Sequence, residues 1–459
     1  MLLSTPPFFA FFLVVCLLFW AATPSRRWQQ IFLLLANCFF LAKFGPVYLL
    51  LAVAATIDFR LALGMAATTS STTRRNLLGL SLLINLGALL SLKSLPLVVG
   101  DRLAWLFTLS LSFYCFQSLS YTIDIFRGDA EPTTDILTYL ASALFFPSIL
   151  AGPIPRQTKL LCQIAAPFRL DNTLAARALL LIATGLVKKL LIADYLADNL
   201  VNRIFDTPTL YSGLENLIGV YGYALQLFFD FSGYTDLAIG VALLLGIDLP
   251  ENFRRPYLAL NLQDFWKRWH MTFSSWLTDF VFDPIPKSRK WLRLSYCTAF
   301  FITFLLGGLW HGIAWTFLVW GALHGLGLST VFLWQRARGP VKARRQASLP
   351  GKILGTFLTF NFVCFTWIFF RAATIPDAVA VLNQIRSATF NTENLSLPVL
   401  GVLTLAIVLH CLPPITFTRS EKLVANLPFW IQGAALAGLI LLIQTFAGKG
   451  SAPFVYGNF

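Results

Sequence analysis

The sequence predicts an all-α polytopic membrane protein with about eleven transmembrane helices and several short amphipathic or re-entrant helices. Of its 459 residues, 57% are hydrophobic and only 12% are charged, whereas about a quarter of the residues of soluble domains are charged. Apolar runs that are long enough to cross a bilayer, or nearly so, recur along the whole chain. Clusters of Lys and Arg flank these runs and give a net charge of +14, which fits the positive-inside rule better than nucleic-acid binding.

The apolar runs follow one another without a long polar segment, so we expect a single integral-membrane domain over residues 1–459. The first run is followed, not preceded, by basic residues, which predicts a retained span with its N-terminus outside. The run 295–334 is either two spans interrupted at 307–312 or one long tilted helix. The basic segments 287–293 and 336–352 are expected to face the cytoplasm. The runs lie at residues 7–23, 29–54, 77–99, 103–123, 136–154, 175–197, 214–247, 295–334, 353–370, 396–413 and 428–447.

Charged residues inside these runs are costly and therefore need an explanation. Asp124 and Arg127 are three residues apart, which predicts an ion pair along one helix. Lys188 and Lys189 are expected to extend their side chains to the cytoplasmic interface.

Asp230 and Asp236 lie in another apolar run, with Tyr234 between them. On a regular helix the two carboxylates would point about 120° apart, so they do not form an obvious catalytic pair. They either brace neighbouring helices or support an active site, and the sequence leaves both interpretations open.

Residues 261–286 are unusually polar for this chain. If they form one helix, a single arc of about 120° holds Phe265, Trp266, Trp269, Phe273, Trp276, Leu277 and Phe280. The opposite side holds Asp264, Lys267, Arg268, Ser275 and Asp279, and His270 lies at the edge of the apolar arc. Such a helix should not cross a bilayer unsupported, so we expect it at the interface or along a cavity that dips into the membrane.

The four histidines differ in their surroundings. His410 ends an apolar run and is interpreted as a hydrogen-bonded interfacial residue, and His324 is interpreted as structural. His311 lies in residues 307–315, where three glycines permit close backbone approach and two tryptophans can wall a pocket. This setting makes His311 a functional candidate.

Several chemistries find no support in the sequence. The seven cysteines are scattered without CxxC spacing, and no metal-ligand, Walker or dinucleotide-binding pattern occurs. A neutral histidine in a pocket at membrane depth can act as a general base near neutral pH. Two classes therefore remain, an intramembrane acyl or glycosyl transferase and a proton-coupled transporter, with a membrane scaffold as a weaker third.

Eight short motifs, in order from about residue 112 to about residue 371, then narrow the choice. They are SFYCFQSLSY (112–121), FFPSILAGP (145–153), GLVKKLLIAD (185–194), FDFSGYTDLAIG (229–240), PENFRRPY (250–257), DFWKRWH (264–270), GLWHG (308–312) and TWIFFR (366–371). In this order they resemble the membrane-bound O-acyltransferase (MBOAT) family, in the bacterial branch typified by the alginate O-acetylation protein. The aromatic tail 453–459 is similar as well.

The resemblance implies a ring of helices around a central tunnel, with a core at about 112–371 and peripheral helices at 1–111 and 372–459. His311 would be the essential catalytic histidine, acting as general base toward the acceptor hydroxyl or briefly carrying the acyl group. His270 would lie near the reaction tunnel, where it would orient the thioester or polarise its carbonyl. The resemblance places further residues along or behind the tunnel wall: Trp266, Arg268, Trp269, Trp310, Asp230, Tyr234 and Asp236.

The activity implied is an O-acyltransferase of the bacterial cytoplasmic (inner) membrane. An acyl group, most simply acetyl, would pass from a cytoplasmic thioester to a hydroxyl for O-acetylation of an exopolysaccharide or cell-wall polymer. The donor would be acetyl-CoA or a carrier-protein thioester acting as substrate, and neither a bound cofactor nor a metal is expected. Partners would be membrane lipids, an extracytoplasmic acyltransferase of the SGNH or alginate-acetylation type, and a cytoplasmic acyl carrier. Transfer of D-alanine to teichoic acid-type polymers is the alternative within the family.

Overall fold

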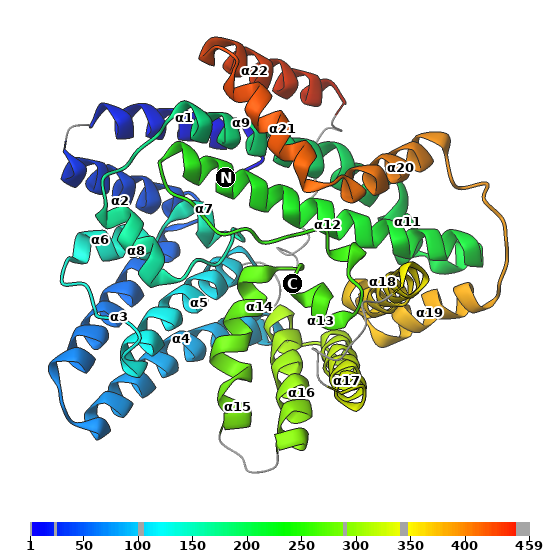
Figure 1. Ribbon diagram of the computed structural model, residues 1–459, viewed down its shortest axis with the longest axis horizontal. Coiled ribbons are helices and arrows are strands. Elements are labelled where there is room, and N and C mark those ends of the chain that lie inside the picture. The colour runs from blue at the N-terminus through cyan, green and yellow to red at the C-terminus, as the bar shows by residue number, and fades with distance from the viewer. Residues whose placement is uncertain (1, 23–24, 100–104, 288–291, 340–347, 447–459) are drawn as a thin grey trace.

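The computed structural model is an assembly of helices joined by short connections (Figure 1). It describes residues 2–22, 25–99, 105–287, 292–339 and 348–446, and no β-strand occurs in these ranges. The all-α fold predicted from the sequence is confirmed. The tail 453–459 and the middle of the basic segments 287–293 and 336–352 lie outside the described residues.

The N-terminal helices form one side of the molecule, coloured blue to cyan in Figure 1. They are α1 (Pro6–Ala21), α2 (Arg26–Ala42), the 3₁₀ turn η1 (Pro46–Leu49), α3 (Leu50–Ala67), α4 (Ser71–Val99) and α5 (Trp105–Arg127). Short helices follow: α6 (Ile136–Ala143), α7 (Phe146–Ile149) and α8 (Gln157–Ala165).

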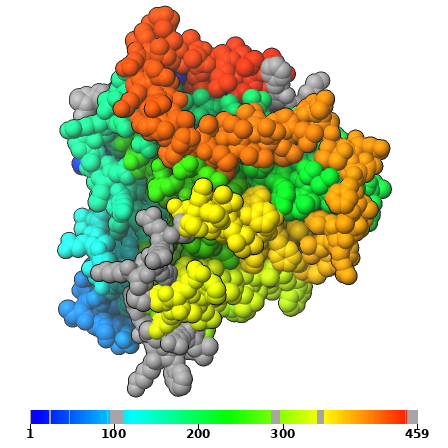
Figure 2. All heavy atoms as spheres, turned by 45° about the vertical axis from the view of Figure 1, so that its right-hand side comes forward, coloured from blue at the N-terminus to red at the C-terminus, as the bar shows by residue number. Residues whose placement is uncertain are grey.

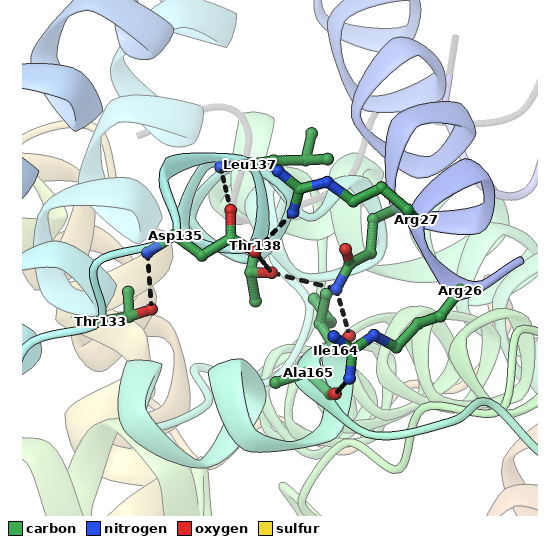
Figure 3. A network of polar contacts seen from close by, with 9 residues as sticks. Arg26, Arg27, Thr133, Asp135, Leu137, Thr138, Ile164 and Ala165 are labelled. Carbon is green, nitrogen blue, oxygen red and sulfur yellow. Dashed lines mark hydrogen bonds and ion pairs between the residues drawn. The ribbon is translucent and has the colours of Figure 1, made fainter.

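Two arginines at the start of α2 fasten the N-terminal helices to α6 and α8 (Figure 3). Arg27 pairs with Asp135 at 2.6 Å, and Arg26 donates to a backbone carbonyl at the end of α8. Burial raises the pKa of Asp135, but hydrogen bonds from Thr138 and Arg27 outweigh that effect and hold the pKa below its usual value. The basic pair after the first apolar run therefore also holds helices together.

Helix α12 (Gly213–Leu244) crosses the centre of the molecule (Figure 1) and is buried over most of its length. A capping box between Ser212 and Glu215 fixes its first turn. A Cβ on Gly185 would lie 2.7 Å from the carbonyl oxygen of Gly233, so α9 and α12 meet backbone to backbone. The elements before α12 are α9 (Asn172–Leu186), π-helical η2 (Val187–Ala193), α10 (Asp194–Leu196), π-helical η3 (Ala197–Val201), α11 (Asn202–Asp206) and η4 (Pro208–Leu210).

The expectation that Lys188 and Lys189 reach the interface is wrong for Lys189. Its side chain is only 2% exposed, and Nζ lies 2.7 Å from carboxylate oxygens of both Asp194 and Asp230. Lys188 is more accessible and pairs with Asp236 at 2.5 Å. An ammonium group this deep is tolerated because carboxylates compensate it, so these pairs brace the π-helical segment against α12.

Residues 261–286 do not form the single amphipathic helix expected from their periodicity. His270 has left-handed backbone torsions (φ 44°), which end one helical segment and redirect the next. Two backbone hydrogen bonds to the loop after α12 stabilise this break. Met271 N–H donates to the carbonyl of Asn252, and Arg254 N–H donates to the carbonyl of Arg268. The 3₁₀ turn η5 (Pro256–Leu258) precedes the region. The region itself is divided into α13 (Leu262–Trp266), α14 (Met271–Leu277), π-helical η6 (Thr278–Phe282) and α15 (Pro284–Lys287).

The run 295–334 forms two helices and not one long tilted helix. The hairpin is tight because a Cβ on Gly308 would lie 2.3 Å from the carbonyl oxygen of Phe317, and one on Gly321 would lie 2.4 Å from that of Phe304. The C-terminal half consists of α16 (Leu292–His311), α17 (Trp315–Ala337), α18 (Leu349–Arg371), α19 (Ile375–Arg386), α20 (Leu397–Cys411), α21 (Pro414–Ala425) and α22 (Phe429–Phe446).

Among the described residues, four helices are long and apolar enough to cross a membrane, and a fifth crossing results if the bent pair α20–α21 counts as one. Several predicted spans are divided into shorter helices, so the expected count of about eleven stays a prediction. The ion pair expected between Asp124 and Arg127 is absent from the described contacts. Arg127 instead donates to the carbonyl of Asp279 and lies over the ring of Phe280.

Candidate active site

His270 lies between α13 and α14, at the break that its left-handed backbone creates. The ring is buried, with 1% of the side chain exposed, and packs against Phe231 and Phe273 at centroid distances of 4.7 and 5.0 Å. Its Nδ1 lies 3.0 Å from Oδ1 of Asn252. One side of the imidazole is therefore anchored by a polar partner from the loop after α12.

The proton of His270 is placed by the partners of Asn252. The backbone N–H of Thr272 donates to the same Oδ1 atom at 3.2 Å, and because that group can only donate, the atom is an oxygen. The Thr272 hydroxyl accepts from Ile154 N–H and donates to Oδ1 at 2.9 Å. Nδ1 of His270 must then carry the proton, which leaves Nε2 with a lone pair. In the described part of the structure Nε2 is buried without a hydrogen-bond partner.

His311 ends α16, and its ring sits among aromatic side chains, with 6% of the residue exposed. Ring-centroid distances are 4.6 Å to Trp310, 4.8 Å to Phe370 and 5.3 Å to Trp320. A Cβ on Gly312 would lie 2.6 Å from the ring of Phe317. The absence of a side chain at Gly312 therefore leaves room for the Phe317 ring, which packs beside the histidine.

The two histidines meet around one pair of aromatic rings. Trp310 lies 6.4 Å from the ring of His270 and 4.6 Å from that of His311. Phe273 lies 5.0 Å from His270 and 6.4 Å from His311, and it packs on Trp310 at 4.5 Å. The indole nitrogen of Trp310 is buried without a hydrogen-bond acceptor among the described residues. The predicted pair of histidines and Trp310 thus form one cluster.

Lys93, in α4, reaches this cluster from the N-terminal side of the molecule. Its Nζ donates to the backbone carbonyl of His311 at 3.4 Å. Lys93 was not among the predicted site residues, although it lies within an apolar run, as Lys188 and Lys189 do. It places a cation beside a buried histidine 218 positions away in sequence.

A cavity of about 600 Å³ adjoins the cluster between the 261–286 region and the α16–α17 hairpin. Phe273 and Trp320, which both contact the ring of His311, line it, as do Trp266 and the polar side chains Ser275 and Lys267. Two further buried groups at its wall lack hydrogen-bond partners in the described structure, Thr303 Oγ1 and Trp320 Nε1. The cavity therefore offers polar groups to a ligand close to His311.

Of the other predicted tunnel residues on the 261–286 region, one lines this cavity and two do not. Trp266 lines the cavity and donates from Nε1 to Nδ1 of His324 at 3.3 Å. Trp269 is buried against Trp367 at 5.2 Å. Arg268 pairs with Asp264 at 2.8 Å and is not part of this cavity wall.

Asp230, Tyr234 and Asp236 lie on α12 behind His270. Asp230 belongs to the buried cluster with Lys189, and Asp236 pairs with Lys188. Both carboxylates therefore connect α12 to η2, which favours the bracing interpretation of the two left open by the sequence.

The two remaining histidines differ from each other. His324 is satisfied on both sides, because Nδ1 accepts from Trp266 and Nε2 lies 2.9 Å from the Thr366 hydroxyl. His410 was expected to be hydrogen-bonded at an interface, and this is wrong. It is buried, and neither ring nitrogen has a hydrogen-bond partner in the described part of the chain.

Comparison with known proteins identifies the family. Residues 128–370 match the model of the membrane-bound O-acyltransferase family, which covers more than half of the chain. The chain belongs to the MBOAT family. As a member of that family it is an enzyme of the acyltransferase class and is bound to a membrane.

Similar MBOAT proteins act on different polymers according to their names. The chain is 32% identical to a peptidoglycan O-acetyltransferase of Helicobacter pylori, over 83% of this chain and 79% of the relative. It is 36% identical to the "Probable alginate O-acetylase AlgI" of Pseudomonas aeruginosa, over 66% of this chain and 57% of that relative. It is 30% identical to a teichoic acid D-alanyltransferase of Bacillus subtilis, over 57% of this chain and 68% of the relative.

Proposed function

We propose that this protein transfers an acyl group, most simply acetyl, from a thioester to a hydroxyl for O-acetylation of an exopolysaccharide or cell-wall polymer. The observation that carries the proposal is the cluster of His270, His311 and Trp310 beside a cavity with unpartnered polar groups. A base, a hydrogen-bond donor and a dry site for two substrates are what acyl transfer from a thioester requires. The names of two relatives support acetyl as the group transferred.

The thioester would enter through the cavity between the 261–286 region and α16. The segments that flank this cavity continue into the basic residues 287–293, which the positive-inside rule assigns to the cytoplasm. The donor is then acetyl-CoA or the thioester of a cytoplasmic acyl carrier, used as a substrate. No resident cofactor takes part in the proposed reaction.

In the reaction, His311 removes the proton of the acceptor hydroxyl while the hydroxyl oxygen attacks the thioester carbonyl. The tetrahedral oxyanion that forms is stabilised by the indole N–H of Trp310 and by the charge of Lys93. Collapse breaks the carbon–sulfur bond, and the departing thiolate takes up the proton held by His311. The new ester and the free thiol leave the site.

His270 accepts a hydrogen bond in this scheme. Because Nδ1 carries the proton, Nε2 can hold a donor such as an amide N–H of the thioester arm or the acceptor hydroxyl. This proton position argues against a role in which Nε2 polarises the thioester carbonyl, since that role needs an N–H at Nε2. His270 therefore orients a substrate by accepting a hydrogen bond.

The proposed location is the bacterial cytoplasmic membrane, with an extracytoplasmic acyltransferase of the SGNH or alginate-acetylation type receiving the acyl group. Transfer of D-alanine from a carrier thioester is the second candidate, because one relative is named a teichoic acid D-alanyltransferase. The two reactions use the same base and differ in the donor.

The test uses the purified full-length protein in nanodiscs with radiolabelled acetyl-CoA and, as hydroxyl acceptors, oligosaccharides of alginate and of peptidoglycan, the polymers in the names of two relatives. We expect wild-type protein to release free CoA, and His311→Ala to lose about a hundredfold or more of that rate while inserting into membranes in normal amount. Near-wild-type release by His311→Ala would contradict the assignment. Consumption of a D-alanyl carrier thioester but not of acetyl-CoA would select the second candidate, and an intact thioester throughout would favour a transporter.

A further inference from the structure

A second cavity, of about 700 Å³, lies between α9, α12 and α21 and has a cationic lining. Its basic side chains are Arg177, Lys188, Arg254 and Arg255. Asp236 neutralises Lys188 at 2.5 Å, and Glu251 neutralises Arg254 at 2.8 Å. No ion pair to Arg177 or Arg255 occurs among the described residues, so the cavity keeps an excess of positive charge.

Arg255 has a strained backbone and a buried side-chain nitrogen without an acceptor among the described residues. Its backbone is left-handed (φ 46°), which is costly for a residue with a side chain, and its Nε is buried with no acceptor in the described structure. A buried guanidinium nitrogen without an acceptor is a position where an anionic ligand can supply the missing oxygen.

His410 forms the boundary between this cationic cavity and an apolar groove. Its ring packs edge to face on Phe228 at 4.6 Å and lies 5.3 Å from the ring of Tyr257. The residue is 6% exposed, and both ring nitrogens lack hydrogen-bond partners among the described residues. Ser232 Oγ, also buried at the wall of the cationic cavity, is unpartnered there as well. The cationic cavity and its boundary with the groove therefore hold buried polar groups that a ligand could pair with.

The groove beyond His410 is apolar and opens toward lipid. It measures about 540 Å³ and lies between α12, α18 and α20, with Leu225, Phe360 and Ile407 in its lining. Ile353, Phe357 and Ile407 on its rim are more than half exposed, and on a membrane protein such apolar residues face acyl chains. Figure 2 shows this face, where α20 and α21 (orange) lie above α18 (yellow).

Together the two spaces match an amphiphile with a phosphate group and a long hydrocarbon chain. Lys352, which lines the apolar groove, closes the basic segment 336–352, and a cationic segment beside a membrane helix attracts anionic lipid headgroups. Acetyl-CoA carries phosphates but has no chain to fill the apolar groove.

We propose that the protein binds one anionic phospholipid from the cytoplasmic leaflet, with its phosphate between Arg177, Arg255 and His410 and one acyl chain in the groove between α18 and α20. The lipid would hold α20 and α21 against α12. This site is a different cavity from the one beside His311, although Asn252, which anchors His270, also lines the cationic cavity. The inference concerns lipid binding, so it goes beyond the proposed function and does not rest on it.

The experiment is native mass spectrometry of the delipidated full-length protein, titrated separately with phosphatidylglycerol, phosphatidylcholine and CoA. We expect one phosphatidylglycerol to bind at least tenfold more tightly than phosphatidylcholine. Arg177→Gln, Arg255→Gln and His410→Phe should each weaken phosphatidylglycerol binding about tenfold. Arg386→Gln, an exposed arginine on α19, serves as the matched control and should bind as wild type.

Two further measurements keep the result interpretable. Thermal unfolding without added lipid shows whether each variant is folded, and Ile407→Trp narrows the groove without touching the cationic cavity. Ile407→Trp should weaken phosphatidylglycerol but leave binding of its deacylated headgroup, glycerophosphoglycerol, unchanged. Equal binding of both phospholipids, binding insensitive to the arginine and histidine variants, or displacement of phosphatidylglycerol by CoA would overturn the proposal.

Discussion

Asn252 determines which nitrogen of His270 can act on a substrate. Its Oδ1 receives two donors from Thr272 and one from the imidazole, so the lone pair of His270 is left on Nε2. The sequence predicted His270 and His311 as site residues through their motifs. It did not predict the contacts from Asn252 and Lys93, because these depend on a left-handed turn and on packing between distant helices that no periodic pattern encodes.

Removing the anchor of His270 should therefore impair catalysis without removing the histidine. Asn252→Leu leaves Nδ1 and both Thr272 donors without an acceptor, and we expect acyl transfer to fall about a hundredfold. Asn252→Asp keeps the acceptor and should retain most of the rate. Because a carboxylate stabilises the imidazolium, the acid limb of its pH–rate profile should move to higher pH. An unchanged rate in Asn252→Leu, in protein with normal thermal unfolding, would contradict the anchoring role.

At the scale of elements, the helical wheel of residues 261–286 predicted one continuous helix and missed the break at His270. The apolar spacing from Phe265 to Phe280 suggests one helix, but the hydrogen bonds of residues 252 and 254 to the region stabilise a break at His270. A tertiary contact thus overrides the local preference for a helix. By contrast, the close backbone approach expected at the glycines of 307–312 is confirmed at Gly308, which meets the backbone of Phe317. A missing side chain is a local property that the sequence shows directly.

The hairpin of α16 and α17 should be sensitive to one added methyl group. Gly308→Ala places a Cβ where the carbonyl oxygen of Phe317 lies 2.3 Å away, and a backbone atom cannot move aside as a side chain can. We expect destabilisation of about 2 kcal/mol and a displaced His311, measured as a lower unfolding temperature and reduced acyl transfer. Gly401→Ala on α20 is the control, since nothing lies within 4 Å of its Cβ and Ala favours a helix. Equal behaviour of the two variants would contradict the close packing.

At the scale of the whole molecule, composition fixed the class and the order of motifs fixed the family. A segment that crosses lipid must satisfy its backbone hydrogen bonds internally, and uninterrupted apolar runs of about 20 residues do so as helices, so the all-α membrane fold follows from the length of these runs. The number of crossings does not follow in the same way. The run 175–197 is divided by π-helical segments, and the run 396–413 forms the 15-residue helix α20, which bends by 88° into α21 at two prolines. Hydropathy does not register such interruptions.

Access to the active-site cavity from one side of the membrane is also a property of the whole molecule. Ser275 is exposed and lines the cavity beside His311, so Ser275→Cys, in protein whose seven native cysteines are replaced, reports on that cavity. We expect an impermeant thiol reagent to label it in inside-out vesicles but not in intact cells, because the neighbouring segment 287–293 is basic. Labelling should abolish acyl transfer and should be slowed by acetyl-CoA, which would occupy the same space.

Ser387→Cys is the control. Ser387 follows α19, which is joined to the C-terminal end of α18, whereas the basic segment 336–352 leads into the other end of α18. Ser387→Cys should therefore be labelled in intact cells. Labelling of Ser275→Cys from outside, or labelling that acetyl-CoA does not slow, would contradict the assignment of this cavity to the thioester donor.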